Sequence, residues 1–365
     1  MGFMATPPTF SRVTSLDALR GFDMLWILGL ESGLRTLIQR FLPELAPAQA
    51  IANQLTHVPW AGFHFYDLIF PLFIFISGAS LAFSQQRHLA TSTPSQLTVR
   101  LIQRGVILFL LGVLFNAGLR DGIEKVRWLG VLQRIAIATT FAGILALYLK
   151  PKALLLTGIG LLVGYSALLL GVPAPGVDTP SFEEGKNIVN WFDQSFLPGR
   201  KHDKTHDPEG ILSNIPAIVS AIAGYLAARS MQAAENRSHL RKHLIIGVLC
   251  IGLGWAIHPW LPIIKKLWTP SFVLVTVGWS LTLLTAFSFW LDNRPKTPLI
   301  EPLLWVGSNP IILYLLTGLG LFRTVAERVT GNKEQALGWM LPITSLLVML
   351  ALARWLHRRG ILVRI

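Results

Sequence analysis

Ten long apolar segments constrain this chain more than any other feature of its sequence. A helix needs about 20 mainly apolar residues to cross the hydrocarbon core of a bilayer. Only 14% of the 365 residues are charged, whereas a soluble domain has about 25% charged residues. We therefore predict an all-α polytopic membrane protein with about ten transmembrane helices, formed by a single domain over residues 1–365. The expected helices are 18–38, 63–85, 97–118, 129–149, 152–170, 211–229, 243–261, 271–291, 298–320 and 339–357.

The basic residues predict the orientation of these helices. The net charge is +13, and short loops rich in Lys and Arg mark the cytoplasmic side of a membrane protein. On that rule both termini are cytoplasmic, and segments 39–62 and 171–210 form outer loops. The basic surplus thus indicates a lipid bilayer as partner and no nucleic acid. Because Cys250 is the only cysteine, the sequence excludes an internal disulfide and a cysteine metal cluster, and we expect no metal.

The stretch HVPWAGFHFYDLIFPLF at 57–73 places ionisable side chains at the mouth of an apolar helix. A charge at membrane depth costs several kcal/mol, so Asp67 is a candidate functional residue. A histidine has an ordinary pKa near 6.5 and can accept a proton at neutral pH. His57 lies just before the helix, whereas His64 lies one turn before Asp67. The pattern alone does not choose between the two histidines.

Glu31 and Arg134 are the other ionisable residues expected near this depth. Asp67 and Arg134 each lie about five residues into a helix from the outer side, or roughly 7 Å. An ion pair between them is therefore expected. Such a pair would belong to a functional site or would only fix helix packing.

Two further groups remain open to two interpretations. Near the inner side, Arg20, Arg100 and Arg104 are placed either to bind phosphates or to anchor helix ends at the membrane surface. In the segment WVGSNPIILY, Pro310 interrupts the helix beside Ser308 and Asn309. These two polar residues either line a site at mid-membrane or belong to a packed kink.

Several ordered motifs resemble one known family. They are SLDALRGFDM at 15–24, HVPWAGFHFYDLIFPLF at 57–73, GVLQRIAI at 130–137, the NIVNWFD to SNIPAI series at 187–218, and KKLWTPSF at 265–272. Together they are similar to the transmembrane N-acetyltransferases typified by lysosomal heparan-α-glucosaminide N-acetyltransferase and its bacterial relatives. The resemblance implies acetyl transfer from cytoplasmic acetyl-CoA to a glucosamine-type amine on the far side. It also implies a protein of the bacterial inner membrane and suggests a homodimer.

The resemblance assigns roles to individual residues. His57 corresponds to the family's catalytic histidine, Asp67 to the acid ten residues later, and His64 has no counterpart. His57 would act as a general base, or would itself be acetylated as a covalent relay. Apart from the resemblance, the position of Arg20, Arg100 and Arg104 at helix entrances on the predicted inner face suggests that they contact acetyl-CoA, and Ser308 is expected to contact it too. The acceptor sugar is expected to contact Glu31, Arg134, Asn187, Asn190, Trp191, Asp193, Asp207, Glu209 and Asn309.

A secondary transporter of amino sugars, such as N-acetylglucosamine, is the alternative function. In that interpretation Asp67, Glu31 and Arg134 would form a proton-coupled site. Transporters often have two repeated halves with interrupted helices at matching positions. The sequence shows no clear repeat, so the acetyltransferase is favoured.

Overall fold

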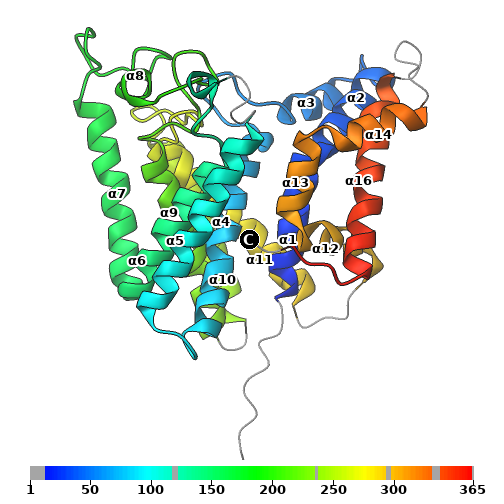
Figure 1. Ribbon diagram of the computed structural model, residues 1–365. Helices are drawn as coiled ribbons and strands as arrows, with labels where there is room; N and C mark the ends of the chain where they lie inside the picture. Colours follow the sequence, from blue (N-terminus) through cyan, green and yellow to red (C-terminus); the bar gives the residue numbers. More distant parts are fainter. Residues whose placement is uncertain (1–12, 117–121, 235–236, 293–296, 331–337, 364–365) are drawn as a thin grey trace, which may run out of the picture.

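The protein is a bundle of α-helices, as the computed structural model shows (Figure 1). Within the described residues, extended pairing is limited to two isolated bridges, Ala61 with Ile264 and Arg127 with Gly199. The predicted all-α class is therefore confirmed. The structure describes residues 13–116, 122–234, 237–292, 297–330 and 338–363.

Long helices form the body of the bundle, and shorter ones connect them or cover their ends. The longer helices are α1 (Thr14–Leu25), α2 (Glu31–Phe41), α4 (Phe65–His88), α5 (Pro94–Phe115), α6 (Val131–Tyr148), α7 (Pro151–Gly171), α9 (Asn214–Ala233), α10 (Ser238–Ala256), α11 (Pro270–Leu291) and α16 (Leu341–Arg358). The shorter helices are α3 (Ala46–Gln54), α8 (Ile188–Phe196), α12 (Glu301–Ser308), α13 (Pro310–Gly318) and α14 (Leu321–Thr330). Single turns occur at η1 (Trp26–Leu30), η2 (Ile123–Lys125), η3 (Pro298–Ile300) and η4 (Gly338–Met340).

Several described helices are long and apolar enough to cross a membrane. Five meet this condition alone, namely α4, α5, α6, α7 and α11, and the bent pair η3–α12 and α13 makes a sixth. The other predicted segments are helical too, but breaks, charges or small polar residues shorten their apolar runs. The chain is thus a polytopic membrane protein with five or six such helices, and ten crossings stay a prediction.

Two of the predicted segments are broken, and each break has a local cause. The segment 18–38 changes direction at η1, where Gly29 has φ 123°, a value that suits glycine because it has no Cβ. The segment 298–320 bends by 73° between α12 and α13. Pro310 begins α13 and has no backbone N–H to continue the hydrogen-bond ladder of α12. The interruption expected at Pro310 is therefore confirmed.

Helix α4 is the central helix of the bundle. In its most apolar window 72% of residues are buried, against 22% in α5 and in α7, whose apolar side chains face the surroundings. Small residues allow α4 and α9 to approach closely: a Cβ at Gly78 would meet the Ala221 carbonyl, and one at Gly224 would meet the Phe75 carbonyl. This packing fixes α4, whose other face lines the site described below.

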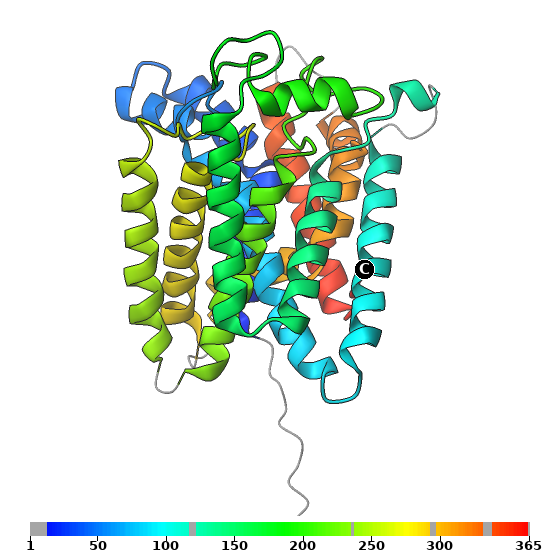
Figure 2. The same ribbon diagram turned by 90° about the vertical axis from the view of Figure 1, so that its left-hand side faces the viewer.

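The loops and several short helices lie at the two ends of the bundle, which form two sides of the molecule. The helices α3 and α8 lie on one side, and the first turn of α1 and the last turn of α16 lie on the other (Figure 1). Figure 2 shows α10, α11 and α7 standing side by side, with loops that flank α8 above the upper end of α7. We call the side of α8 outer and the opposite side inner. Which side faces the cytoplasm stays a prediction.

Candidate active site

His57 and Asp67 form a hydrogen-bonded pair at the outer end of α4. His57 Nδ1 lies 2.8 Å from Asp67 Oδ1. The other carboxylate oxygen accepts hydrogen bonds from the backbone N–H groups of Val58, at 3.3 Å, and His64, at 3.1 Å. Asp67 is buried, whereas about half of the His57 side chain is exposed. The acid therefore holds one ring nitrogen and leaves the imidazole accessible from the outer side.

Lys265 completes this group, and sequence reasoning gave it no role. Its ammonium lies 3.0 Å from His57 Nδ1 and 3.4 Å from Asp67 Oδ1. Burial lowers the pKa of Lys265 below its usual value, and the charge of Asp67 offsets only part of that effect. The position comes from a tight turn in which the Trp268 N–H donates to the Lys265 carbonyl at 2.9 Å. Trp268 has φ 51°, which is unusual for a bulky residue, and its side chain is buried.

Tyr66 covers one face of the imidazole. The two rings lie 4.7 Å apart between centroids and are tilted by 30°. Stacking of this kind restrains the orientation of His57 about its side-chain torsions. His64 takes a different part: it caps the start of α4, and its Nδ1 lies 3.0 Å from the Thr56 carbonyl oxygen.

A cavity of about 580 Å³ connects this group to the inner half of the bundle. His57, Tyr66, Lys265 and Glu209 line its outer end. One face of α4 lines the cavity from end to end. Its lining residues recur every three or four positions from Tyr66 to Arg87. That interval corresponds to roughly 30 Å along a helix, about the thickness of a bilayer's hydrocarbon core. The cavity therefore runs from one side of the helical bundle to the other.

The inner part of the cavity is cationic. Arg20, Arg87, His88 and Arg104 line it. Arg20 pairs with Asp17 at 3.1 Å and donates to the Ser80 hydroxyl. Within the described residues Arg104 has no carboxylate at ion-pair distance, and its principal charged neighbour is Arg20. Such a site suits an anionic ligand. Arg100 is exposed and does not line the cavity.

Ser308 and Asn309 are separated by the bend between α12 and α13. Ser308 lines the cavity; its hydroxyl lies 2.6 Å from the Leu304 carbonyl and 2.9 Å from His357 Nδ1. Asn309 is fully buried and holds the segment after α16 through the Ile361 carbonyl, at 2.9 Å, and the Val363 N–H, at 2.8 Å. Its amide is thus engaged in packing, which matches the packed-kink interpretation.

The expected ion pair between Asp67 and Arg134 is wrong. Asp67 pairs with His57 and Lys265 instead. Arg134 is fully buried; it donates to the Ser213 hydroxyl and lies over the Trp268 ring at 4.5 Å. Equal depth does not place two side chains on facing surfaces, because each further residue rotates a helix by about 100°. Glu31, for its part, pairs with Arg35 at 3.2 Å beside the outer mouth and does not line the cavity.

Most of the outer-loop residues predicted to meet a sugar hold the loop together. Asn187 caps α8 and donates to Asn190 Oδ1 at 2.6 Å. Asp193 accepts from the Ile211 N–H at 2.8 Å, and burial raises its pKa to about 6. Trp191 packs edge-on against Phe196. None of these side chains lines the cavity, so direct contact with a ligand stays a prediction.

Asp207 and Glu209 are organised by Arg127, which sequence reasoning did not single out. Arg127 donates to both oxygens of Asp207, at 2.7 and 2.8 Å, and to Glu209 at 2.6 Å. Burial alone would raise the pKa of Asp207, but the hydrogen bonds and charge of Arg127 hold it below its usual value. Burial raises the pKa of Glu209. Of this network, Glu209 lines the cavity.

The comparisons with known proteins identify the family of the chain. The sequence profile described as "Heparan-alpha-glucosaminide N-acetyltransferase, catalytic" matches residues 12–250. The heparan-alpha-glucosaminide N-acetyltransferase of Homo sapiens is 25% identical over 324 residues, which cover 71% of this chain and 48% of the human protein. The Mus musculus protein of the same name is 24% identical over 326 residues, with the same coverage. The chain thus spans about half the length of these curated relatives. Because the profile covers well over half of the chain, the chain belongs to the family of heparan-alpha-glucosaminide N-acetyltransferase catalytic domains.

Proposed function

We propose that this chain is a transmembrane acetyltransferase. It would move the acetyl group of acetyl-CoA, bound from the inner side, to the amine of a glucosamine-type sugar on the outer side. One observation carries the proposal: a single cavity joins the His57, Asp67 and Lys265 group to the Arg20 and Arg104 pair. A group-transfer reaction across a membrane needs such a connection between an anion-binding end and a proton-accepting end.

The inner end suits the phosphates of coenzyme A. Arg20 and Arg104 place two cations near each other, and a bound phosphate would relieve their repulsion. Ser80 contacts Arg20, and Tyr66 lies beside His57. The distance between these two residues along α4 is about 21 Å. An extended pantetheine arm along this apolar face would bring the thioester to the outer mouth. Ser308 lies on the same wall.

His57 is placed to act as the general base. The amine nitrogen attacks the thioester carbonyl carbon, a C–N bond forms, and the carbonyl oxygen becomes an oxyanion. His57 takes the amine proton, the oxyanion collapses to the amide carbonyl as the C–S bond breaks, and the His57 imidazolium returns the proton to the departing thiolate of coenzyme A. Asp67 orients the ring and stabilises the imidazolium, as the acid of a catalytic triad does.

Lys265 supplies positive charge where the oxyanion develops. Its ammonium lines the cavity and lies beside the imidazole. A donor held in a buried site interacts more strongly with developing charge than one in water. Lys265 is better placed for this role than Asn309, whose amide is engaged in packing.

The acceptor would enter from the outer side past Glu209. This carboxylate lines the cavity and is tied to Arg127 and Asp207 in the outer loop. It offers an attractive partner for a protonated sugar amine. We place the protein in a bacterial inner membrane; a homodimer stays a prediction from the family resemblance.

Amino-sugar transport is the second candidate function. The specific observation in its favour is the bend of 73° between α12 and α13, since transporters often use broken helices at mid-membrane. Against it stand the family and the paired His57 and Asp67. A transporter would move intact sugar without consuming acetyl-CoA, and that difference separates the two candidates.

The direct test is transfer of labelled acetyl from acetyl-CoA to glucosamine by the purified full chain in detergent. His57→Ala should lower turnover by about 10²–10⁴ while acetyl-CoA still binds. His64→Ala, the matched control, should lose little, because His64 caps α4. Acetyl-CoA without acceptor separates the two mechanisms: a stable acetyl adduct on His57 would favour the covalent relay. Wild-type turnover in His57→Ala would refute this site.

A further inference from the structure

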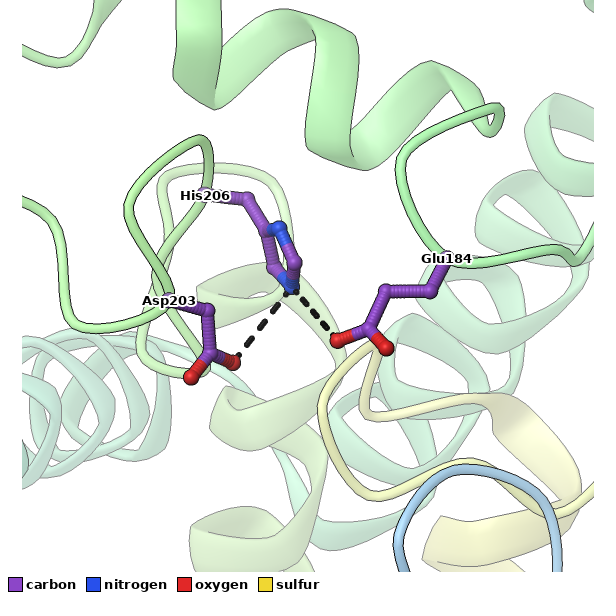
Figure 3. A group of neighbouring side chains, drawn as sticks. All are labelled: Glu184, Asp203 and His206. Carbon is purple, nitrogen blue, oxygen red and sulfur yellow. Dashed lines mark ion pairs between the residues drawn. The ribbon is translucent and has the colours of Figure 1, made fainter.

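The outer loop holds a second cluster of chemically active side chains that the proposed reaction does not use. Glu184, in the segment before α8, and Asp203 and His206, in the segment after it, turn their ligand atoms toward a common point (Figure 3). All three atoms lie within 4.8 Å of one another. We propose, against the expectation of no metal, that Glu184, Asp203 and His206 form a binding site for a divalent transition-metal ion such as Zn²⁺.

The spacing of the three atoms fits a metal better than it fits hydrogen bonds. His206 Nε2 lies 3.4 Å from Glu184 Oε1 and 3.5 Å from Asp203 Oδ2. Both separations exceed the usual range of N–H···O hydrogen bonds, about 2.7–3.2 Å. A tetrahedral zinc with bonds of about 2.0–2.2 Å separates its ligand atoms by about 3.3–3.6 Å. Figure 3 shows the imidazole edge directed between the two carboxylates.

His206 is oriented toward this point and has an unused nitrogen there. It is 2% exposed, and Nε2 has no hydrogen-bond partner among the described residues. Its other ring nitrogen lies 3.1 Å from the Thr205 hydroxyl, the kind of contact that orients metal-binding histidines. A tight turn brings Asp203 and His206 together. In this turn the Asp203 N–H donates to the His206 carbonyl at 3.1 Å, and Lys204 has φ 65°.

Lys266 now occupies the place of the cation. Its ammonium lies 2.8 Å from both Glu184 Oε1 and Asp203 Oδ2. One ammonium balances only one of the two carboxylates, although the exposed His202 also contacts Asp203, at 2.9 Å. A divalent ion would balance both. Two cations so close together would repel each other, so metal and Lys266 compete for the same two oxygens. Lys266 is partly exposed and has a route to solvent.

The ligand types select the class of metal. An imidazole nitrogen with two carboxylate oxygens suits Zn²⁺ and the late first-row divalent ions. Ca²⁺ and Mg²⁺ prefer oxygen ligands throughout. Three protein ligands leave a fourth tetrahedral position for water.

Cobalt(II) is the probe for this site, because tetrahedral Co²⁺ absorbs visible light strongly. The full chain, freed of any histidine tag and treated with a chelator, is titrated in detergent. We expect visible absorption that saturates near one Co²⁺ per chain and disappears when Zn²⁺ is added. His206→Ala and the near-isosteric Glu184→Gln should lose it. His202→Ala, which removes a histidine from the same loop, should retain it.

Lys266→Met tests the competition. Removing the ammonium should tighten Co²⁺ binding by about tenfold. The proposal is wrong if wild type gives no such absorption up to about 1 mM Co²⁺, even if Lys266→Met gives one, or if His206→Ala absorbs as wild type does. The readout does not involve acetyl transfer, so failure here leaves the proposed function standing, and the reverse also holds.

Discussion

At the scale of single residues, the outer mouth combines side chains that are far apart in sequence. His57 and Asp67 are ten positions apart, and a motif connects them. Lys265 lies 208 positions beyond His57 and outside the part of the chain that the family profile matches. The motif KKLWTPSF at 265–272 marks this segment as similar to the family, but two neighbouring lysines do not indicate which of them reaches the site, so the sequence alone assigned no role to Lys265. Only the turn closed by Trp268 brings it to the imidazole.

The role of Lys265 can be measured by removing its charge. Lys265→Met should lower kcat for acetyl transfer by about 10²–10³, the usual effect of losing one oxyanion donor. The KM for acetyl-CoA should change little, because the nucleotide would be held at the opposite end of the cavity. Lys265→Arg should recover part of the loss. Lys186→Met, an exposed outer-side control, should behave as wild type; a Lys265→Met enzyme of full kcat would contradict the assignment.

Asp193 predicts how the stability of the outer loop depends on pH. Burial raises its pKa from 3.8 to about 6 in the folded protein. The protonated form is thus favoured on folding. The contribution of protonated Asp193 to the free energy of unfolding is complete below about pH 4 and is lost as the pH rises through 6. Its total is about 2–3 kcal/mol.

Thermal unfolding of wild type and Asp193→Asn between pH 4 and 8 measures this contribution. The amide introduced by Asp193→Asn does not titrate, so the difference in Tm between the two proteins should change across pH 4 to 6 in favour of the variant at the higher pH. A constant difference over the whole range would show that Asp193 does not titrate in this way.

At the scale of elements, hydropathy predicted helices well and their facing surfaces poorly. Each of the ten apolar segments contains a helix, although some extend past its ends, as 243–261 does beyond Ala256, and the break at Pro310 was expected from proline alone. The cavity was not foreseen, because the residues of α4 that line it, such as Phe70 and Phe73, look like ordinary core. Asp67 and Arg134 fail to pair for the same reason: depth follows from counting residues, but rotation about the helix axis depends on packing.

Helices α1 and α5 each contribute one arginine to the inner cavity, and this predicts where coenzyme A binds. Arg20→Ala and Arg104→Ala, combined, should weaken acetyl-CoA binding, and the remaining affinity should depend less on salt, since two charge contacts are lost. Arg100→Ala is the matched control: it lies one turn earlier on α5, is exposed and does not line the cavity. Titration calorimetry at two salt concentrations measures both effects. Equal weakening by Arg100→Ala would contradict a phosphate site inside the cavity.

At the scale of the whole molecule, the two ends of the cavity differ in chemistry, so the inner and outer sides of the bundle are not equivalent. Its cationic end and its histidine end lie in opposite halves of the bundle, about a membrane thickness apart along α4. No single motif contains this relation, because α1, α4, α5, α6, α13 and the Lys265 turn all supply walls. The family could be inferred from ordered motifs, whereas the path between the two ends required the fold.

Sided transfer in proteoliposomes tests the central claim most directly. Acetyl-CoA labelled in its acetyl group is sealed inside vesicles in which the inner side of the protein faces the lumen. Glucosamine is supplied only outside, on the side of His57. We predict labelled N-acetylglucosamine on the glucosamine side, no coenzyme A there, and almost no product from His57→Ala vesicles. Movement of unlabelled glucosamine into the vesicles without acetylation, or labelled product only after the vesicles are opened with detergent, would contradict acetyl transfer across the membrane.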